Sequence, residues 1–361
     1  MNRSNRIKIL QITSYPPPRA GWGVRVEFLK KRLESDGHIC TMLNLGRSRT
    51  TPSPEYETVL GGMDYVKKVW RFSRAGFVVH MHMNGESPKG FVLALLAEFI
   101  NLSWGRRCFL TFHAGIDQPY FPRPKYPWLV PMYWVIFTIP RRIVCNNEAV
   151  KAKIVEYGID AAKIVPIPAF STQYVEREPA DLPDDVTVFY RQHSHVVLTY
   201  IRFREGFYID TMIEGFAIAA ARIPTLGLAL LGRSGDIEES LLTDLESRID
   251  RHALGDRVCW IDDLSHGEFL ETLSRSILYL RTPTTDGVAS SVLESLALKV
   301  PVVGAQNGTR PAGVITYEAT NPTDLAAKVL YVVENHDTVV ESLPMPEVRD
   351  TLADEVALLT Q

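Results

Sequence analysis

Apolar and polar positions alternate in blocks along the whole chain. Short apolar runs, rich in Ile, Val and Leu, are typical of buried parallel strands. The first series of such runs lies at 7–13, 39–45, 77–83, 107–112, 143–146 and 164–167. A second series lies at 196–201, 226–231, 258–261, 277–280 and 300–303. The intervening stretches have helical spacing, as Val26, Leu29 and Leu33 illustrate. Two successive strand–helix series predict an α/β protein with two doubly wound domains.

The segment from Ser171 to Asp185 differs from its surroundings. It is polar and acid-rich, and it contains Pro179 and Pro183. Such composition is typical of an interdomain linker. We therefore expect a first domain over 1–172, a linker over 173–190 and a second domain over 191–361. Whether the last helix packs back on the first domain is left open.

Composition narrows the cellular setting. The chain has 361 residues and four cysteines, none with metal-ligand spacing, which favours a reducing compartment. The N-terminus lacks a signal-peptide core, and the longest apolar stretch, 126–140, is interrupted by prolines. These features predict a cytoplasmic protein.

Charge is distributed unevenly between the two halves. Residues 1–172 carry 24 Lys and Arg against 12 Asp and Glu, whereas 173–361 carry 15 against 30. The basic half is expected to face an anionic acceptor or membrane, or the two domains attract each other. Both interpretations stay open.

The loop after the first strand contains Gly21 and Gly23, just before a helix. Glycine lets a ligand approach the backbone, and a helix N-terminus favours a phosphate. An ordinary glycine-rich turn is the alternative.

Neither domain shows the three-glycine dinucleotide fingerprint, so a nicotinamide dehydrogenase is disfavoured.

The strongest motif follows the strand that ends near Arg281. Asp286 and Gly287 lie in a loop, a helix begins near Ala289, and Glu294 lies eight residues after Asp286. Two acids so placed can bind sugar hydroxyls. The free amides of Ala289, Ser290 and Ser291 suit a pyrophosphate. The alternatives are a helix cap for Asp286 and a solvated helix face for Glu294.

This segment resembles the acid–seven residues–acid signature of family 4 glycosyltransferases. Asp286 stands for the first Glu of that signature, Ala289 for a Gly, and Lys299 lies near another Gly. The resemblance extends to Gly21-Trp22-Gly23, to the strand-end His113 and to the glycine loop at 231–235.

The resemblance implies a GT-B fold, with two Rossmann-like domains facing across a cleft. It implies retaining transfer from a UDP- or GDP-linked sugar to a glycan or lipid-linked acceptor, in bacterial cell-surface polysaccharide synthesis. No Asp-x-Asp motif stands in a suitable place, so we expect no metal and no other cofactor.

The resemblance also implies residue roles. His113, Asp286 and Arg202 are the expected catalytic residues. Arg204 is expected to replace the usual Lys of the diphosphate clamp, whose position holds Glu205. The expected donor-binding set is Gly21, Gly23, Arg202, Arg204, Gly232, Arg233, Asp286, Gly287, Ala289, Ser290, Ser291 and Glu294.

Partners follow from the same reasoning. We expect a nucleotide sugar and an anionic acceptor, and no nucleic acid. Basic residues beside apolar helices leave open a peripheral contact with an anionic membrane. They are Lys30, Lys31, Arg32, Arg106, Arg107, Arg141 and Arg142. The alternative functions are a sugar-nucleotide epimerase of the same shape and a degenerate binding protein without transfer activity.

Overall fold

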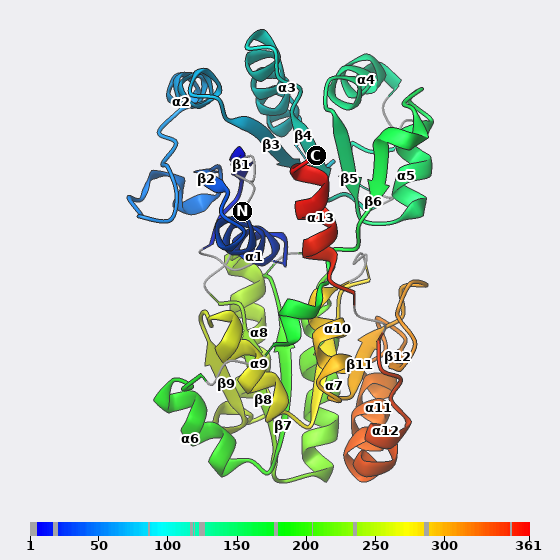
Figure 1. Cartoon of the computed structure of the whole chain (residues 1–361). Helices are drawn as coiled ribbons and strands as arrows, with labels where there is room; N and C mark the ends of the chain where they lie inside the picture. The colour runs from blue at the N-terminus through cyan, green and yellow to red at the C-terminus, as the bar shows by residue number, and fades with distance from the viewer. Residues whose placement is uncertain are drawn as a thin grey trace. The chain divides into compact units, whose positions relative to one another are not determined.

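In a computed structural model the chain divides into two compact units, each built on a six-stranded parallel sheet (Figure 1). Unit 1 comprises Met1–Gln173 and Arg349–Gln361, and unit 2 comprises Tyr174–Val348. The structure describes residues 6–16, 21–85, 87–115, 118, 120–122, 127–176, 180–203, 205–233, 237–284, 289–346 and 349–361.

The sheet of unit 1 has the strand order β2-β1-β3-β4-β5-β6. Its strands are β1 (Lys8–Thr13), β2 (Ile39–Asn44), β3 (Val78–Met83), β4 (Phe109–Phe112), β5 (Arg142–Cys145) and β6 (Ile164–Pro166). The order reverses between β1 and β3, which pair in parallel with Gln11 opposite His80. Ligands of doubly wound sheets bind beyond the carboxyl ends of the strands at such a reversal.

Helices cover both faces of this sheet. One face is covered by α2 (Gly62–Arg74), α3 (Pro88–Ser103), α4 (Val130–Thr138) and α5 (Glu148–Val155). The other face is covered by α1 (Gly21–Ser35) and the C-terminal helix α13 (Thr351–Leu359). Leu29 and Leu33 of α1 meet Leu352 and Leu359 of α13 in one buried cluster. The end of the chain therefore completes the fold of unit 1.

The sheet of unit 2 has the order β12-β11-β10-β7-β8-β9. Its strands are β7 (His195–Tyr200), β8 (Leu226–Leu231), β9 (Val258–Ile261), β10 (Leu278–Arg281), β11 (Val302–Ala305) and β12 (Val314–Tyr317). The order reverses between β7 and β10, so the loops after these two strands lie side by side.

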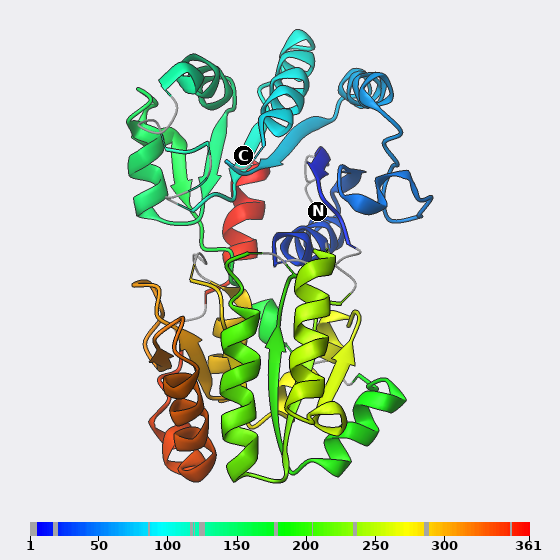
Figure 2. The ribbon, with the colours of Figure 1, turned by 180° about the vertical axis from the view of Figure 1, so that it is seen from behind.

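Two helical layers enclose the second sheet. Figure 2 shows one layer, which consists of α7 (Ile209–Arg222), α8 (Glu239–Arg251) and α11 (Pro322–Glu334). The other layer consists of α6 (Asp184–Gln192), α9 (His266–Ser274) and α10 (Ser290–Ala297). A short helix, α12 (His336–Ser342), follows α11.

The two predicted strand series are confirmed, and two details differ. The segment expected as a linker contains α6, which buries Val186 and Phe189 in the core of unit 2. Its acidic first turn made it look like a polar connection, although the apolar residues recur at helical spacing. The edge strand β12 was not predicted, because its residues are only partly buried.

Candidate functional site

The carboxyl edge of the second sheet carries those predicted donor-binding residues of unit 2 that the structure describes. Arg202 follows β7, Gly232 and Arg233 follow β8, and Ala289 to Ser291 open the helix that follows β10. Because all six strands are parallel, these loops share one edge of the sheet. Arg204, Asp286 and Gly287 lie outside the described residues.

Glycine is required at position 232 because two of these loops approach each other closely there. Its φ is +120°, and a Cβ atom there would lie 2.2 Å from the carbonyl oxygen of Ile201. Its amide donates a hydrogen bond to the carbonyl of Ile261 at 3.1 Å. Only glycine therefore allows the loops after β7 and β8 to approach this closely. The next residue, Arg233, has its guanidinium 5.3 Å from the Trp260 ring centroid.

Two arginines lie at the reversal point of the sheet. The half-buried Arg202 donates from Nε to the hydroxyl of Tyr200 at 3.1 Å. Arg281, at the end of β10, is buried, and its guanidinium lies 5.9 Å from the Tyr200 ring centroid and 5.8 Å from that of Phe207. A cation at this edge favours a diphosphate. Sequence reasoning missed Arg281, although an arginine closing an apolar strand was a signal for it.

Glu294 is buried in the second turn of α10, with 4% of its surface exposed. Loss of hydration raises the pKa of this carboxyl to about 8. Its Oε1 lies 3.9 Å from Nε2 of His266, which lies 2.9 Å from the carbonyl oxygen of Tyr174. At neutral pH Glu294 is therefore mainly protonated and can both donate to and accept from hydroxyl groups. The solvated helix face considered from the sequence is wrong, because the side chain is buried.

The start of α10 has no side-chain cap. Ala289 occupies the N-cap position with no side-chain hydrogen bond to the helix. The first amides of such a helix have no intrahelical partner and carry the positive end of its dipole. After β10, the buried hydroxyl of Thr282 has no hydrogen-bond partner among the described residues. The uncapped first amides of α10 are therefore candidates to bind an anionic group.

In unit 1 the predicted His113 belongs to a histidine cluster at the reversal point of the first sheet. Its Nε2 lies 2.9 Å from Nδ1 of His82, and Nε2 of His82 lies 2.6 Å from Oε1 of Gln11. Trp22 contacts His113 edge to face, with ring centroids 4.9 Å apart. Burial lowers the pKa of His113 to about 3 and that of His82 well below its usual value. Both rings are therefore neutral at pH 7.

The direction of these hydrogen bonds follows from the chemistry of Gln11. An amide oxygen only accepts, so His82 donates from Nε2 and accepts at Nδ1. His113 must then donate from Nε2, which leaves its Nδ1 as an acceptor. The cluster thus presents a neutral imidazole of defined tautomer, suited to accept a hydrogen bond from a hydroxyl group.

A buried ion pair lies beside the cluster. Arg25 of α1 donates from Nε to Glu355 of α13 at 2.8 Å, and neither side chain is exposed by more than 2%. Thr111 donates to the same carboxylate at 3.3 Å and lies 2.7 Å from Nε2 of His80. Sequence reasoning missed Arg25 and Glu355, because 330 residues separate them along the chain.

The two glycines of the first glycine loop lie at the start of α1. Gly21 begins α1, and a Cβ on Gly23 would meet Pro16 at 3.5 Å, an ordinary contact. Packing therefore does not require glycine at position 23. A phosphate site at this loop stays a prediction.

Several of the basic residues expected beside apolar helices have intramolecular partners in the structure. Lys30 lies 2.8 Å from Glu55, and Lys31 lies 3.0 Å from Glu27. Arg107 and Arg141 donate to backbone carbonyls of unit 1. A contact of the basic residues with an anionic membrane stays a prediction.

Comparison with solved structures defines the fold. Solved structures that resemble the chain include Anabaena HepE in complex with UDP and glucose (TM-score 0.70, 16% identity, 98% of this chain and 99% of that one). Sucrose-phosphate synthase from Thermosynechococcus elongatus also matches (TM-score 0.65, 14% identity, 98% of this chain and 98% of that one). A putative UDP-N-acetylglucosamine 2-epimerase from Listeria monocytogenes matches similarly (TM-score 0.66, 14% identity, 98% of this chain and 95% of that one). The fold is GT-B, with two Rossmann-like units.

A match to a protein-family model adds information about the reaction. Residues 190–342 match the family model described as glycosyl transferases group 1. This range contains Arg202, Gly232, Arg233 and Glu294. No curated protein matches the chain. The family match supports glycosyl transfer as the reaction class, and the fold is shared with epimerases.

Proposed function

We propose that the protein is a retaining glycosyltransferase that moves a sugar from a UDP- or GDP-linked donor to a glycan or lipid-linked anionic acceptor. Its setting would be bacterial cell-surface polysaccharide synthesis at the cytoplasmic side of the membrane. The observation that carries the proposal is the buried Glu294 carboxyl at the carboxyl edge of the second sheet, within a segment that matches glycosyl transferases group 1.

In this proposal unit 2 binds the donor. The buried Glu294 binds the ribose hydroxyls, because a protonated carboxyl can donate one hydrogen bond and accept others. Gly232 and Arg233 border the nucleotide. Arg202 and the amides of Ser290 and Ser291 stabilise the charge that develops on the departing diphosphate, which is the costly event of the reaction. Arg204, Asp286 and Gly287 keep the roles that the resemblance implies.

Unit 1 would bind the acceptor and supply His113. Because His113 is neutral, with Nδ1 as an acceptor, it would orient a hydroxyl group of the reacting sugar rather than provide a positive charge. We propose that no metal ion is needed. Activity that persists in EDTA would support this, and restoration by added Mn²⁺ or Mg²⁺ would contradict it.

The test is nucleotide-sugar binding and turnover. UDP- and GDP-linked sugars are screened by thermal shift, since a ligand of the folded state raises its melting temperature. We expect one nucleotide series to bind and Glu294→Ala to lose this binding. The matched control is Glu246→Ala on the exposed side of α8. Binding unchanged in Glu294→Ala would overturn the proposal.

Product analysis separates the alternatives. An epimerase converts the donor sugar without an acceptor, so a new sugar epimer in an acceptor-free reaction would favour that function. The histidine cluster of unit 1 keeps this candidate open, because epimerisation needs groups that move a proton. Donor binding with neither transfer, hydrolysis nor epimerisation would indicate a degenerate binding protein.

A further inference from the structure

One end of unit 1 exposes large apolar side chains. Helices α2, α3 and α4 lie together there, with α3 packed against both neighbours (Figure 1). We call their solvent side the α2–α4 face. Its exposed apolar residues are Met63, Trp70, Val92, Leu96, Phe99, Leu102, Trp104 and Trp134. Met63 is 70% exposed, Phe99 53% and Trp134 50%. Surface helices normally present polar groups at such positions.

The apolar residues of α3 form a stripe. Val92, Leu96 and Phe99 are spaced four and three residues apart, so they share one side of the helix. The opposite side is buried against β3 and includes Phe91 and Ala97. Helix α3 is therefore apolar on both its core side and its solvent side. Packing in the core of unit 1 accounts for the apolar residues on the buried side of α3. It does not account for those on the solvent side.

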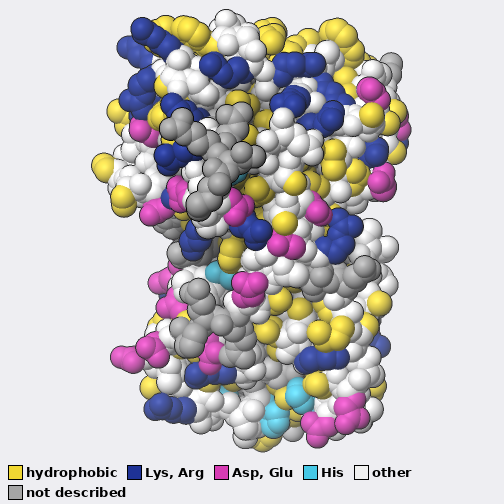
Figure 3. Space-filling view, in the orientation of Figure 1, with side chains coloured by type: hydrophobic (Ala, Val, Ile, Leu, Met, Phe, Trp, Pro, Cys, Tyr) yellow, Lys and Arg dark blue, Asp and Glu magenta, His cyan; other side chains and the backbone are white. Residues whose placement is uncertain are grey.

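Basic side chains accompany the stripe. Residues 62–107 contain seven Lys and Arg against three Asp and Glu. One of these acids, Glu98, is fully buried, so its carboxyl is not on the solvent side of the helices. Figure 3 shows apolar and basic side chains mixed over this end of unit 1. The face is thus both apolar and cationic.

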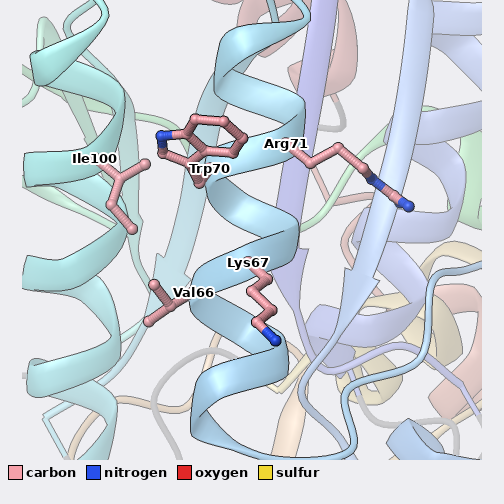
Figure 4. A pocket seen from close by; sticks show the side chains of 5 residues that line it. All are labelled: Val66, Lys67, Trp70, Arg71 and Ile100. Atoms are coloured by element: carbon pink, nitrogen blue, oxygen red, sulfur yellow. The ribbon is translucent and has the colours of Figure 1, made fainter.

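A shallow groove of about 390 Å³ runs between α2 and α3. Val66, Trp70 and Ile100 line it, and Lys67 and Arg71 project from α2 beside it (Figure 4).

Indole rings and cations meet at the end of this groove. The Trp70 ring lies 5.8 Å from that of Trp104, and the guanidinium of Arg74 lies 5.4 Å from the Trp70 centroid. Arg71 is 3.1 Å from Glu57, whereas Lys67 is exposed and belongs to no ion pair among the described residues. Tryptophan beside Lys and Arg is the combination that favours a membrane–water interface.

We propose that the α2–α4 face docks on the surface of an anionic phospholipid bilayer. The aliphatic stripe and the indoles would enter the headgroup region, and the cations would contact the lipid phosphates. A second copy of the chain would bring like charges together, and a nucleic acid would leave the aliphatic stripe without a partner. None of the described helices is long and apolar enough to cross a bilayer. The proposal assigns a surface to the membrane setting of the proposed function, and vesicle binding tests it separately from sugar transfer.

The test is co-sedimentation of the full chain with vesicles. Pure phosphatidylcholine vesicles are compared with vesicles in which a third of the lipid is phosphatidylglycerol. We expect binding to the anionic vesicles only, a blue shift of tryptophan fluorescence, and at least tenfold weaker binding in about 0.5 M salt. The double variant Leu96→Gln with Phe99→Gln is expected to lose the blue shift and at least nine-tenths of the binding.

A charge variant and a matched control complete the design. Lys67→Glu with Arg74→Glu is expected to abolish the preference for anionic lipid. The control is Ile218→Gln with Arg222→Glu, which alters a shallow groove of unit 2 that also contains Glu334. We expect this control to bind vesicles like the wild type. Circular dichroism and UDP-sugar thermal shifts in all variants separate loss of docking from loss of folding or of donor binding.

Three outcomes would overturn the proposal. They are no binding to anionic vesicles, equal binding by the Leu96→Gln/Phe99→Gln variant, and a lipid-free dimer that this variant dissociates in sedimentation velocity. The last outcome would instead assign the face to a second copy of the chain.

Discussion

The Nε2 atom of His113 lies 2.9 Å from the Nδ1 atom of His82, and this hydrogen bond sets which nitrogen of His113 carries the proton. We predict that His82→Phe keeps the ring volume but leaves both Gln11 and His113 without their partner. Each unsatisfied buried group costs about 1–3 kcal/mol, so the loss of both hydrogen bonds should destabilise unit 1 by about 2–6 kcal/mol. In transfer assays kcat should fall while donor affinity stays constant, because we propose that His82 and His113 do not contact the nucleotide.

Imidazole ¹⁵N chemical shifts give a readout that stability alone would not change. Wild-type His113 should report the tautomer protonated at Nε2, and His82→Phe should show a mixture of tautomers. His336→Phe in unit 2 is the control and should alter neither property. An unchanged His113 tautomer in His82→Phe would contradict the assigned direction of these hydrogen bonds.

The same cluster predicts acid sensitivity of unit 1. Burial lowers the pKa of His80 to about 4 and that of His113 to about 3. In the unfolded chain both histidines bind protons below about pH 6.5. Between about pH 6.5 and pH 4 the unfolded state therefore binds more protons, and each histidine lowers the free energy of unfolding by up to about 1.4 kcal/mol per pH unit of acidification.

Tryptophan fluorescence in urea measures this effect selectively. Five of the six tryptophans belong to unit 1, so fluorescence follows that unit, and calorimetry follows both. The urea midpoint should decrease steadily below about pH 6.5. A midpoint independent of pH down to about pH 4 would show that the histidines titrate normally.

The sequence predicted the strand series well, because strands buried on both faces must be apolar throughout. The sequence could not predict contacts between residues that are far apart along the chain. Arg25 and Glu355 lie at opposite ends of the sequence, and nothing local distinguishes Glu355 from a surface acid. His113 was found from a strand-end motif, whereas the role of Gln11 emerges only from the pairing of β1 with β3. The burial of Glu294 likewise depends on packing around α10 that no local pattern records.

The Arg25–Glu355 pair predicts that the C-terminal helix stabilises unit 1. Glu355→Gln keeps the shape of the side chain but leaves the guanidinium of Arg25 buried without its counter-ion. Breaking a buried ion pair on one side costs about 3–5 kcal/mol. The fluorescence-detected midpoint of unit 1 should drop accordingly, and the calorimetric transition of unit 2 should not move. The exposed Glu341→Gln on α12 serves as control. A change confined to unit 2 would contradict the assignment of α13 to unit 1.

Gly232 predicts a steric requirement at the donor edge. Gly232→Ala would bring a methyl group within 2.2 Å of the Ile201 carbonyl oxygen, at a φ of +120°. Backbone strain of this kind costs about 1–3 kcal/mol, and its relief must separate the loops after β7 and β8. We expect weaker nucleotide binding and a lower melting temperature. Gly255→Ala is the control, because nothing lies within 4 Å of its Cβ position. Equal behaviour of the two variants would show that the loops are free to separate.

Glu294 predicts a stability change of the opposite sign to that of the histidines. Burial raises its pKa to about 8, whereas in the unfolded chain the carboxyl ionises near pH 4.5. Between these values the folded state binds more protons, so the free energy of unfolding of unit 2 falls as pH rises, by up to about 1.4 kcal/mol per pH unit, and levels off above pH 8. Glu294→Gln is uncharged at every pH and should remove this dependence.

Donor binding distinguishes this assignment from a purely structural role. A glutamine side chain can both donate and accept, like the protonated carboxyl, so Glu294→Gln should bind the nucleotide sugar within about tenfold of the wild type at pH 7. Glu294→Ala removes these hydrogen bonds and should lose about 10- to 100-fold. Isothermal titration calorimetry at pH 7 and pH 9 provides both measurements. If Glu294→Gln binds as poorly as Glu294→Ala at pH 7, the ionised carboxylate is the binding form, and its burial must be relieved by the donor itself.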